Sequence, residues 1–244
     1  MAQPSARLVL ATRNPGKLRE LRELLRGQVP GLDVDTQVID AAAAGVPDVA
    51  ETGVTFEQNA LLKAHAVAAA TGLPAAADDS GLAVDVLGGA PGIFSARWSG
   101  RHGDDTANLV LLLAQLADIS AEHRGAAFVC AAALALPDGS GTVERGELRG
   151  TLLQAPRGTG GFGYDPILQP DGFSSSCAEL SSAEKNAISH RAKACEKMLA
   201  IMKQYDVSPS QINVEITETA MMTSFAIVEE NLSKMVSSHI AISL

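Results

Sequence analysis

The sequence is poor in the features that mark several large classes of protein. Its 244 residues include three cysteines and no C-x-x-C pair, so neither a disulfide framework nor a zinc site is predicted. Its 19 lysines and arginines are outnumbered by 28 aspartates and glutamates, and the net charge of −9 argues against binding to duplex nucleic acid or a membrane surface. No apolar run approaches the roughly 20 residues of a membrane span, and the N-terminal run is too short for a signal peptide. We therefore expect a soluble, cytoplasmic protein.

The chain alternates between short apolar runs and segments with helical periodicity. Residues 7–11 predict a strand, and the leucines that follow predict a helix that ends at Gly27. Further helices are predicted over residues 55–71, 104–117 and 181–203. Because these helices are separated by strand-like runs and no repeat is present, an α/β fold is predicted.

The strand-like runs complete this pattern. A strand is predicted within residues 32–40, and two short strands joined by an acidic turn are predicted in residues 74–91. The run GAAFVCAAALALP, residues 125–137, predicts a strand that continues into a hairpin with TVERGELRGTLL. Together these segments predict a mixed sheet with flanking helices.

The stretch TGVTFEQNALLKAHA, residues 52–66, has the signature of a helix start. Thr55 stands at the N-cap position and Gln58 follows three residues later, which is the spacing of a capping box. In that interpretation Gln58 and Lys63 only cap and solvate a helix. The alternative is that these polar side chains face a ligand.

The segment TRNPGK lies between a predicted strand and a predicted helix. It places Asn14 and Lys17 where free backbone N–H groups and the helix dipole favour an anion. A plain turn with a solvated lysine is the alternative, and the G-K-[ST] ending of a P-loop is absent.

The segment ADDSGL places two adjacent carboxylates, Asp78 and Asp79, before Ser80 and Gly81. Neighbours in a strand point to opposite faces, so both carboxylates can serve one site only if the backbone turns, which Gly81 permits. Such oxygen ligands suit Mg²⁺ bound to phosphates. A solvated turn has the same composition and is the alternative.

The segment GTGGFG, residues 158–163, matches the pattern G-x-G-x-x-G, but Pro166 follows where a dinucleotide site requires a helix. A glycine hinge that presents Phe162 and Tyr164 for stacking on a base, with Asp165 as an acceptor, fits better. A buried aromatic anchor is the alternative.

Farther along, Ser189, His190 and Arg191 follow Lys185 on a predicted helix. Three consecutive helical residues fan over roughly 200°, so they cannot all face the core. Arg191 and His190 could donate to a carbonyl, although each residue alone is more often a surface residue.

Taken together, these segments resemble the inosine/xanthosine triphosphate pyrophosphatases, also called Ham1-like proteins. The motifs are LATRNPGKLRE, TFEQNALLKA, ADDSGLAVDVLGGAPGIFSARWSG, GTGGFGYDPIL and AELSSAEKNAISHR, in that order, over about residues 6–194. The resemblance implies hydrolysis of ITP, dITP and XTP to the monophosphate and pyrophosphate with Mg²⁺. It also implies a homodimer of an elongated mixed α/β fold, with the site in a cleft between two lobes.

The resemblance also implies roles for matching positions. Asp79 and Lys63 are the expected catalytic residues, with Asp79 activating the attacking water. The expected metal positions are Asp78, Asp79 and Gln58. The expected substrate-binding residues are Thr12, Asn14, Lys17, Ser80, Phe162, Tyr164, Asp165, Lys185, His190 and Arg191.

Position 58 departs from the resemblance, because many members carry glutamate where this chain has Gln58. An amide lacks the negative charge that would help to bind Mg²⁺, so weakened hydrolysis is expected. The alternative function is a purine-triphosphate-binding protein with impaired turnover.

The C-terminal segment is a second departure. We predict a pyrophosphatase domain over residues 1–195 and a separate fragment over residues 196–244. VSPSQINVEITETAMM and HIAISL resemble an internal piece of EAL-type cyclic-di-GMP phosphodiesterases, in which Glu215 would match a metal ligand. The other ligands and the EAL signature are missing, so this partial α/β appendage is not expected to be active.

Overall fold

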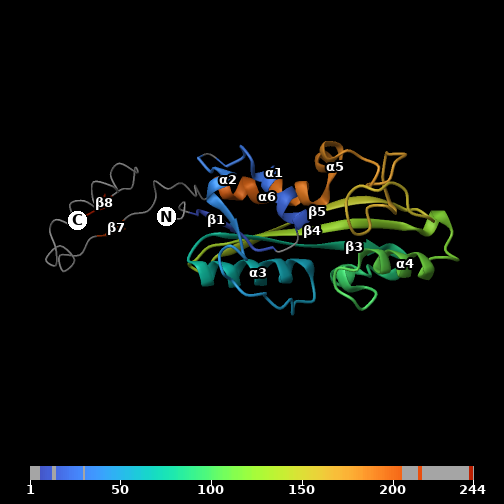
Figure 1. Cartoon of the computed structure of the whole chain (residues 1–244), viewed down its shortest axis with the longest axis horizontal. Coiled ribbons are helices and arrows are strands. Elements are labelled where there is room, and N and C mark those ends of the chain that lie inside the picture. Colours follow the sequence, from blue (N-terminus) through green and yellow to red (C-terminus); the bar gives the residue numbers. More distant parts are fainter. Residues whose placement is uncertain (1–5, 13–14, 30, 205–213, 216–241, 244) are drawn as a thin grey trace.

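The computed structural model describes residues 6–12, 15–29, 31–204, 214–215 and 242–243 (Figure 1). Within these residues, no helix is both long enough and apolar enough to cross a membrane. The predicted residue Asn14 lies outside the described residues.

A six-stranded mixed sheet forms the centre of the fold, as predicted. The strand order is β2-β1-β3-β4-β5-β6. β1 (Leu8–Leu10) pairs in parallel with β2 (Val38–Asp40) and with β3 (Ala75–Val84). The antiparallel half follows, with β4 (Gly125–Ala135), β5 (Gly141–Leu152) and β6 (Leu168–Pro170). The long strands β3, β4 and β5 run along the length of the domain (Figure 1).

Helices cover both faces of this sheet. α3 (Phe56–Thr71) packs on one face, whereas α1 (Pro15–Leu25) and α6 (His190–Gln204) pack on the other (Figure 1). The sequence of β4 explains this arrangement, because alternate side chains of a strand point to opposite faces. Val129 and Ala131 belong to the core under α3, while Cys130 and Ala132 belong to the core under α6. A strand that is covered on both sides reads as a continuous apolar run.

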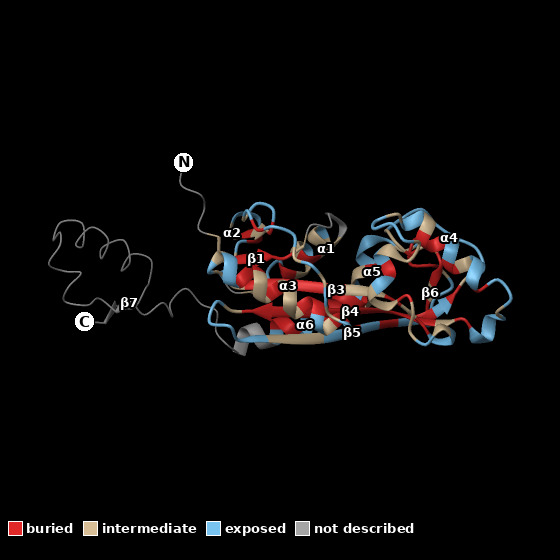
Figure 2. Ribbon diagram, turned by 90° about the horizontal axis from the view of Figure 1, so that it is seen from below, coloured by how far each residue is buried: buried red, intermediate tan, exposed pale blue. Residues whose placement is uncertain are grey.

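A third core lies at the far end of the sheet and makes the second lobe. There α4 (Asp105–Gln115) packs its buried Leu112 with Leu82 and Val84 of β3. Three 3₁₀ turns complete this lobe, namely η1 (Asp85–Leu87), η2 (Gly92–Arg97) and η3 (Ala121–His123). Figure 2 shows buried residues along the central strands, with exposed residues on the outer surfaces of the helices. The predicted elongated, two-lobed architecture is therefore confirmed.

The sequence prediction for residues 74–91 was wrong in one respect. β3 is one strand of ten residues, and Gly81 pairs with Val129 inside the ladder rather than making a turn. The glycine is needed because η2 lies very close. A Cβ at position 81 would come 2.4 Å from the carbonyl oxygen of Gly92 and 2.5 Å from Oγ of Ser95.

The predicted helix over residues 181–203 is two helices. α5 (Ser182–Ile188) ends at Ser189, whose backbone is extended with ψ 148°. The Ser189 hydroxyl then accepts a hydrogen bond from the Ala192 N–H at 3.0 Å, so it caps the start of α6. His190 and Arg191 consequently stand in the first turn of a new helix.

Residues 32–40 also differ from the prediction of a single strand. The carboxylate of Asp33 accepts from the Asp35 N–H at 3.0 Å and begins the short helix α2 (Val34–Gln37). Only Val38–Asp40 is a strand.

At the C-terminal end, β7 (Val214–Glu215) pairs in parallel with β8 (Ile242–Ser243). Residues 196–204 of the predicted EAL-like fragment belong to α6, and its other residues, apart from β7 and β8, lie outside the described residues.

Candidate active site

A cavity of about 760 Å³ lies where the two lobes meet. Its volume is within the range of small-molecule sites. The end of β1, together with α3 and β3, forms part of its wall. The second-lobe segments η2 and α4, the loop before β6 and the helices α5 and α6 form the rest. The predicted residues that line it are Thr12, Lys17, Lys63, Asp79, Ser80, Phe162, Tyr164, Asp165, Lys185, His190 and Arg191.

Asp78 and Asp79 lie on opposite faces of β3, because the strand does not turn at Gly81. Asp79 faces α3 and lines the cavity. Asp78 faces α1 and α6 and is 1% exposed, and it is not part of the cavity wall. The expectation that both carboxylates share one site is therefore corrected: the two groups have different surroundings.

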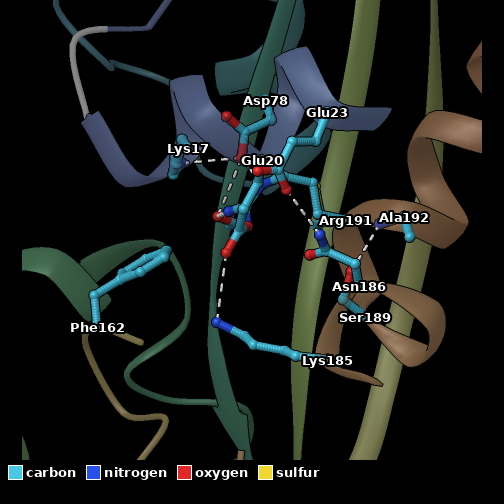
Figure 3. A network of polar contacts seen from close by, with 12 residues as sticks. Lys17, Glu20, Glu23, Asp78, Phe162, Lys185, Asn186, Ser189, Arg191 and Ala192 are labelled. Carbon is cyan, nitrogen blue, oxygen red and sulfur yellow. Dashed lines mark hydrogen bonds and ion pairs between the residues drawn. The ribbon is translucent and has the colours of Figure 1, made fainter. Parts of the chain in front are cut away.

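Asp78 is surrounded by cations. Its Oδ2 lies 3.1 Å from Nζ of Lys17 and 3.2 Å from Nε of Arg191, and it accepts from the Ser80 hydroxyl at 3.2 Å. Burial alone would raise the pKa of Asp78, but the charges of Lys17 and Arg191 outweigh it and hold that pKa well below its usual range. Figure 3 shows Lys17 and Arg191 converging on this carboxylate from α1 and α6. Asp78 is thus placed to orient two cavity cations.

Asp79 has fewer partners. Its Oδ1 lies 3.5 Å from Nζ of Lys63, and its Oδ2 accepts from the side-chain amide of Asn59 at 3.2 Å. Burial raises the pKa of Asp79, and the charges of Lys63 and Lys17 only partly offset it. Two adjacent carboxylates whose pKa values are pushed in opposite directions are suited to different chemical roles. Asp79, with the raised pKa, is the better proton acceptor of the two carboxylates.

Glu51 is a cavity residue that the sequence reasoning missed. Its Oε1 lies 2.6 Å from Nζ of Lys63, and its Oε2 lies 3.9 Å from the guanidinium of Arg97, another missed residue. Burial would lower the pKa of Lys63, but Asp79, Asp78 and Glu51 raise it, so the ammonium stays charged. Glu51 precedes α3 by several residues in an irregular loop, so no local spacing rule relates it to Lys63.

Gln58 does not join this group, in contrast to the prediction. It is exposed, and its Oε1 accepts from the Val54 N–H at 2.8 Å. Its own N–H donates to the Thr55 hydroxyl at 3.1 Å. At the third position of α3 the side chain turns back to the preceding loop, as in a capping box, but it reaches Val54, one residue before the N-cap Thr55. Gln58 therefore lies where the helix-start interpretation places it, and it does not line the cavity.

The opposite side of the cavity carries the aromatic residues. Phe162 has the ammonium of Lys185 at 4.9 Å from its ring centroid, and that ammonium donates to Oδ2 of Asp165 at 2.7 Å. The Tyr164 hydroxyl is engaged elsewhere, because it donates to the backbone oxygen of Ser95 at 3.0 Å. Burial raises the pKa of Asp165, an effect that Lys185 partly offsets. Phe162 is therefore the ring available for stacking.

His190 and Arg191 complete this side from the first turn of α6. The His190 ring stacks on Phe128 at 5.1 Å, and burial, reinforced by the charges of Arg191 and Lys185, lowers its pKa well below the usual range. A neutral imidazole keeps one N–H donor. Glu20 of α1, a further residue that the sequence reasoning missed, pairs with Arg191 and lies 3.5 Å from Nζ of Lys185 (Figure 3).

Among the described residues, no group of three or more histidine, cysteine, aspartate or glutamate side chains is placed to hold a metal ion. Two carboxylates, of Glu51 and Asp79, do lie within 3.5 Å of the same Lys63 nitrogen. Mg²⁺ commonly uses one or two carboxylates together with waters and substrate phosphates. The donor set therefore fits a metal that is completed by a bound triphosphate.

Comparison with known proteins agrees with this geometry. The sequence profile of the Ham1 family matches residues 8–201. The chain is 67% identical over 198 residues to a dITP/XTP pyrophosphatase of Streptomyces avermitilis, covering 81% of this chain and 98% of that protein. It is 53% identical to a dITP/XTP pyrophosphatase of Mycobacterium tuberculosis, with 81% and 95% covered.

Solved structures give the same result. The structure of a HAM1 protein from Coxiella burnetii superposes with a TM-score of 0.72 at 39% identity, covering 82% of this chain and 99% of that one. The Staphylococcus aureus Ham1 protein has a TM-score of 0.71 at 36% identity, with 82% and 99% covered. Sequence and fold agree over nearly the whole length of these proteins, and the chain belongs to the Ham1 family.

Proposed function

We propose that the protein hydrolyses ITP, dITP and XTP to the monophosphate and pyrophosphate, and so removes deaminated purines from the nucleotide pool. The observation that carries the proposal is Asp79, a cavity carboxylate with a raised pKa, beside the Lys63 ammonium. Such a pair can activate a water molecule next to a bound anion. Close relatives named dITP/XTP pyrophosphatase support the substrate class.

The cationic side of the cavity would hold the triphosphate. Lys17 and Lys63 line it from α1 and α3, and Thr12 and Ser80 add polar groups from the ends of β1 and from β3. The proposed role of Asn14, on the same loop as Thr12, rests on the sequence motif alone. Asp79 would take a proton from a water molecule that attacks the α-phosphorus, and the lysines would neutralise charge on the departing pyrophosphate.

Mg²⁺ is the proposed cofactor, and Glu51 and Asp79 are the carboxylates that would hold it. Bound with the phosphates, it would stabilise negative charge on the leaving group. Asp78 has a different proposed role, since its position fixes Lys17 and Arg191 rather than a metal.

The aromatic side would hold the base. Phe162 would stack on the purine, and Lys185, His190 and Arg191 would donate hydrogen bonds to a 6-oxo group. Tyr164 and Asp165 would shape this pocket through their contacts to Ser95 and Lys185. Adenine carries an amino group at position 6, which is itself a donor and cannot accept from these side chains. Binding ATP would therefore leave buried donors unpaired, which is costly in free energy.

The alternative of a binding protein with impaired turnover assumed that Gln58 replaces a metal ligand. Its premise loses support, because Gln58 is exposed and engaged in capping α3. Glu51 keeps a carboxylate in the cavity.

We also propose a domain boundary, an oligomeric state and a cellular location. We place the end of the pyrophosphatase domain after α6, slightly beyond residue 195, because Met198 and Leu199 of α6 are buried in the core. The EAL-like assignment of the remaining residues rests on the resemblance of their sequence. A cytoplasmic homodimer is proposed, and the exposed apolar side chains Val110 and Leu111 on α4 and Phe94 on the adjacent η2 would suit a subunit contact.

A substrate panel tests the proposed function. We expect pyrophosphate release from ITP, dITP and XTP to exceed release from ATP by at least about 100-fold, since discrimination by hydrogen-bonding groups reaches about 10⁴–10⁵-fold. GTP carries the same 6-oxo group, so its rate shows whether the site also reads position 2 of the purine. Omission of Mg²⁺ should abolish turnover. Equal rates with ATP, or orthophosphate as the product, would contradict the proposal.

A further inference from the structure

The loop that carries Phe162 is held by three backbone N–H groups. The Gly160 N–H donates to the backbone oxygen of Ala178 at 3.0 Å, and the Phe162 N–H donates to Oδ2 of Asp165 at 2.8 Å. The Gly163 N–H donates to Oδ2 of Asp105 at 2.8 Å. The first two acceptors are 18 and 3 positions away in the sequence, whereas Asp105 belongs to α4 and is 58 positions away. Asp105 therefore ties the loop to the second lobe.

This loop needs such a tie because its backbone is flexible by composition. Gly161 and Gly163 flank Phe162 and have φ values of 72° and 61°, in the left-handed region that glycine adopts without strain. Lys185 contacts the face of the Phe162 ring, and the carboxylates of Asp165 and Asp105 hold the peptide groups on either side of it.

Asp105 is not required to begin α4. That role belongs to Asp104, whose Oδ1 accepts from the Ala107 N–H at 3.0 Å. Asp105 is the first residue inside the helix and also lines the cavity, so its side chain reaches from the helix start to the loop. Neighbouring aspartates thus have separate tasks: one caps the helix and the other contacts the loop.

We infer that Asp105 is a positioning residue for the base-binding ring. By accepting from the Gly163 N–H it fixes the segment that carries Phe162 before the nucleotide enters, which reduces the ordering cost of binding. The inference rests on the proposed function for its kinetic consequence, because Phe162 is taken to stack on the purine. The contact between α4 and the loop is independent of that function and can be measured without substrate.

Two measurements on full-length Asp105→Ala, Asp105→Asn and Asp104→Ala proteins test the inference. Hydrogen–deuterium exchange of the substrate-free proteins should show faster exchange in a peptide covering residues 158–164 for Asp105→Ala. Exchange in β4 should be unchanged. The KM for ITP should rise roughly five- to tenfold, the scale of one ordinary hydrogen bond lost at an exposed contact, while kcat changes less than about twofold. Asp105→Asn keeps an acceptor oxygen, so its loop exchange and its KM for ITP should both be close to those of the wild type.

Asp104→Ala is the matched control, because it removes the helix cap one residue away without touching the loop. It should lower the melting temperature and leave both loop exchange and KM as in the wild type. If Asp105→Ala leaves loop exchange unchanged, or if Asp104→Ala raises KM as much, the inference is overturned. Faster loop exchange in a protein that hydrolyses no ITP would instead support the contact and reject the proposed function.

Discussion

Asp78 and Asp79 are neighbours on β3, yet their side chains lie on opposite faces of the sheet and their pKa values shift in opposite directions. Asp78 is held ionised by Lys17 and Arg191. Asp79, buried beside Lys63, is the group with a raised pKa. This division of tasks, with one carboxylate orienting cations and the other accepting a proton, underlies the predictions that follow.

The first prediction concerns the pH dependence of hydrolysis. Because burial raises the pKa of Asp79 in the free enzyme, before Mg²⁺ and nucleotide bind, and kcat/KM refers to that state, the acid limb of kcat/KM for ITP should lie above the ordinary aspartate value of about 3.9. Activity should fall as the pH decreases through the raised pKa, since a protonated Asp79 cannot take a proton from water. A pH series of kcat/KM measures the limb, with unfolding monitored at each pH as the control. An acid limb at or below the ordinary value would contradict the assignment.

A second prediction concerns the stability that Asp78 provides. Asp78→Asn should lower the free energy of unfolding at pH 7 by about 3–5 kcal/mol, because two buried cations lose their partner. The folded pKa of Asp78 lies below its unfolded value, so this contribution is complete above about pH 4 and is lost as the pH falls toward the folded pKa. Urea unfolding of both proteins at pH 7 and near pH 3 should show the difference shrinking at low pH. A difference that grows on acidification would refute the account.

A third prediction assigns the metal dependence to Glu51. Glu51→Gln keeps the size of the side chain and removes its charge, so the Mg²⁺ concentration for half-maximal activity should rise at least about tenfold, as expected when a ligand loses its charge. Glu57→Gln is the matched control, because Glu57 pairs with the exposed Arg145 on the outside of α3. A Mg²⁺ titration of activity compares the two variants. Similar shifts in both variants would remove Glu51 from the metal site.

A fourth prediction concerns Gln58. Gln58→Glu should leave the rate of pyrophosphate release within about twofold of the wild type, because the side chain caps α3 outside the cavity. Gln58→Ala should lower the melting temperature, since the Val54 N–H loses its acceptor. Rates with ITP at several Mg²⁺ concentrations provide the measurement. A large gain in activity for Gln58→Glu would restore the original hypothesis of a missing metal ligand.

Much of the fold could be predicted because local patterns determine it. Thr55 and Gln58 mark the start of α3, and Gly72 adopts the left-handed conformation that ends it. The errors at Gly81 and Ser189 had different causes, one a contact between distant segments and the other a local cap. Gly81 reads as a turn residue, but its missing Cβ makes room for η2. Ser189 reads as a helical residue, but its hydroxyl begins a second helix.

The candidate site was predictable where motif residues line the cavity directly, as Lys63, Asp79 and Phe162 do. It was not predictable where a residue acts through tertiary pairing. Glu51 reaches Lys63 from an irregular loop, and Glu20 reaches Arg191 from another helix. No spacing along the chain encodes either contact.

The central claim is that Asp79 activates a water molecule for attack at the α-phosphorus. Hydrolysis of ITP in ¹⁸O-labelled water, with mass spectrometry of both products, tests it directly when wild type and Asp79→Asn are compared. The account predicts that the label enters the monophosphate, and that Asp79→Asn lowers kcat by about 10²–10⁴-fold while the protein stays folded. Label in the pyrophosphate, or an Asp79→Asn variant with wild-type kcat, would contradict it.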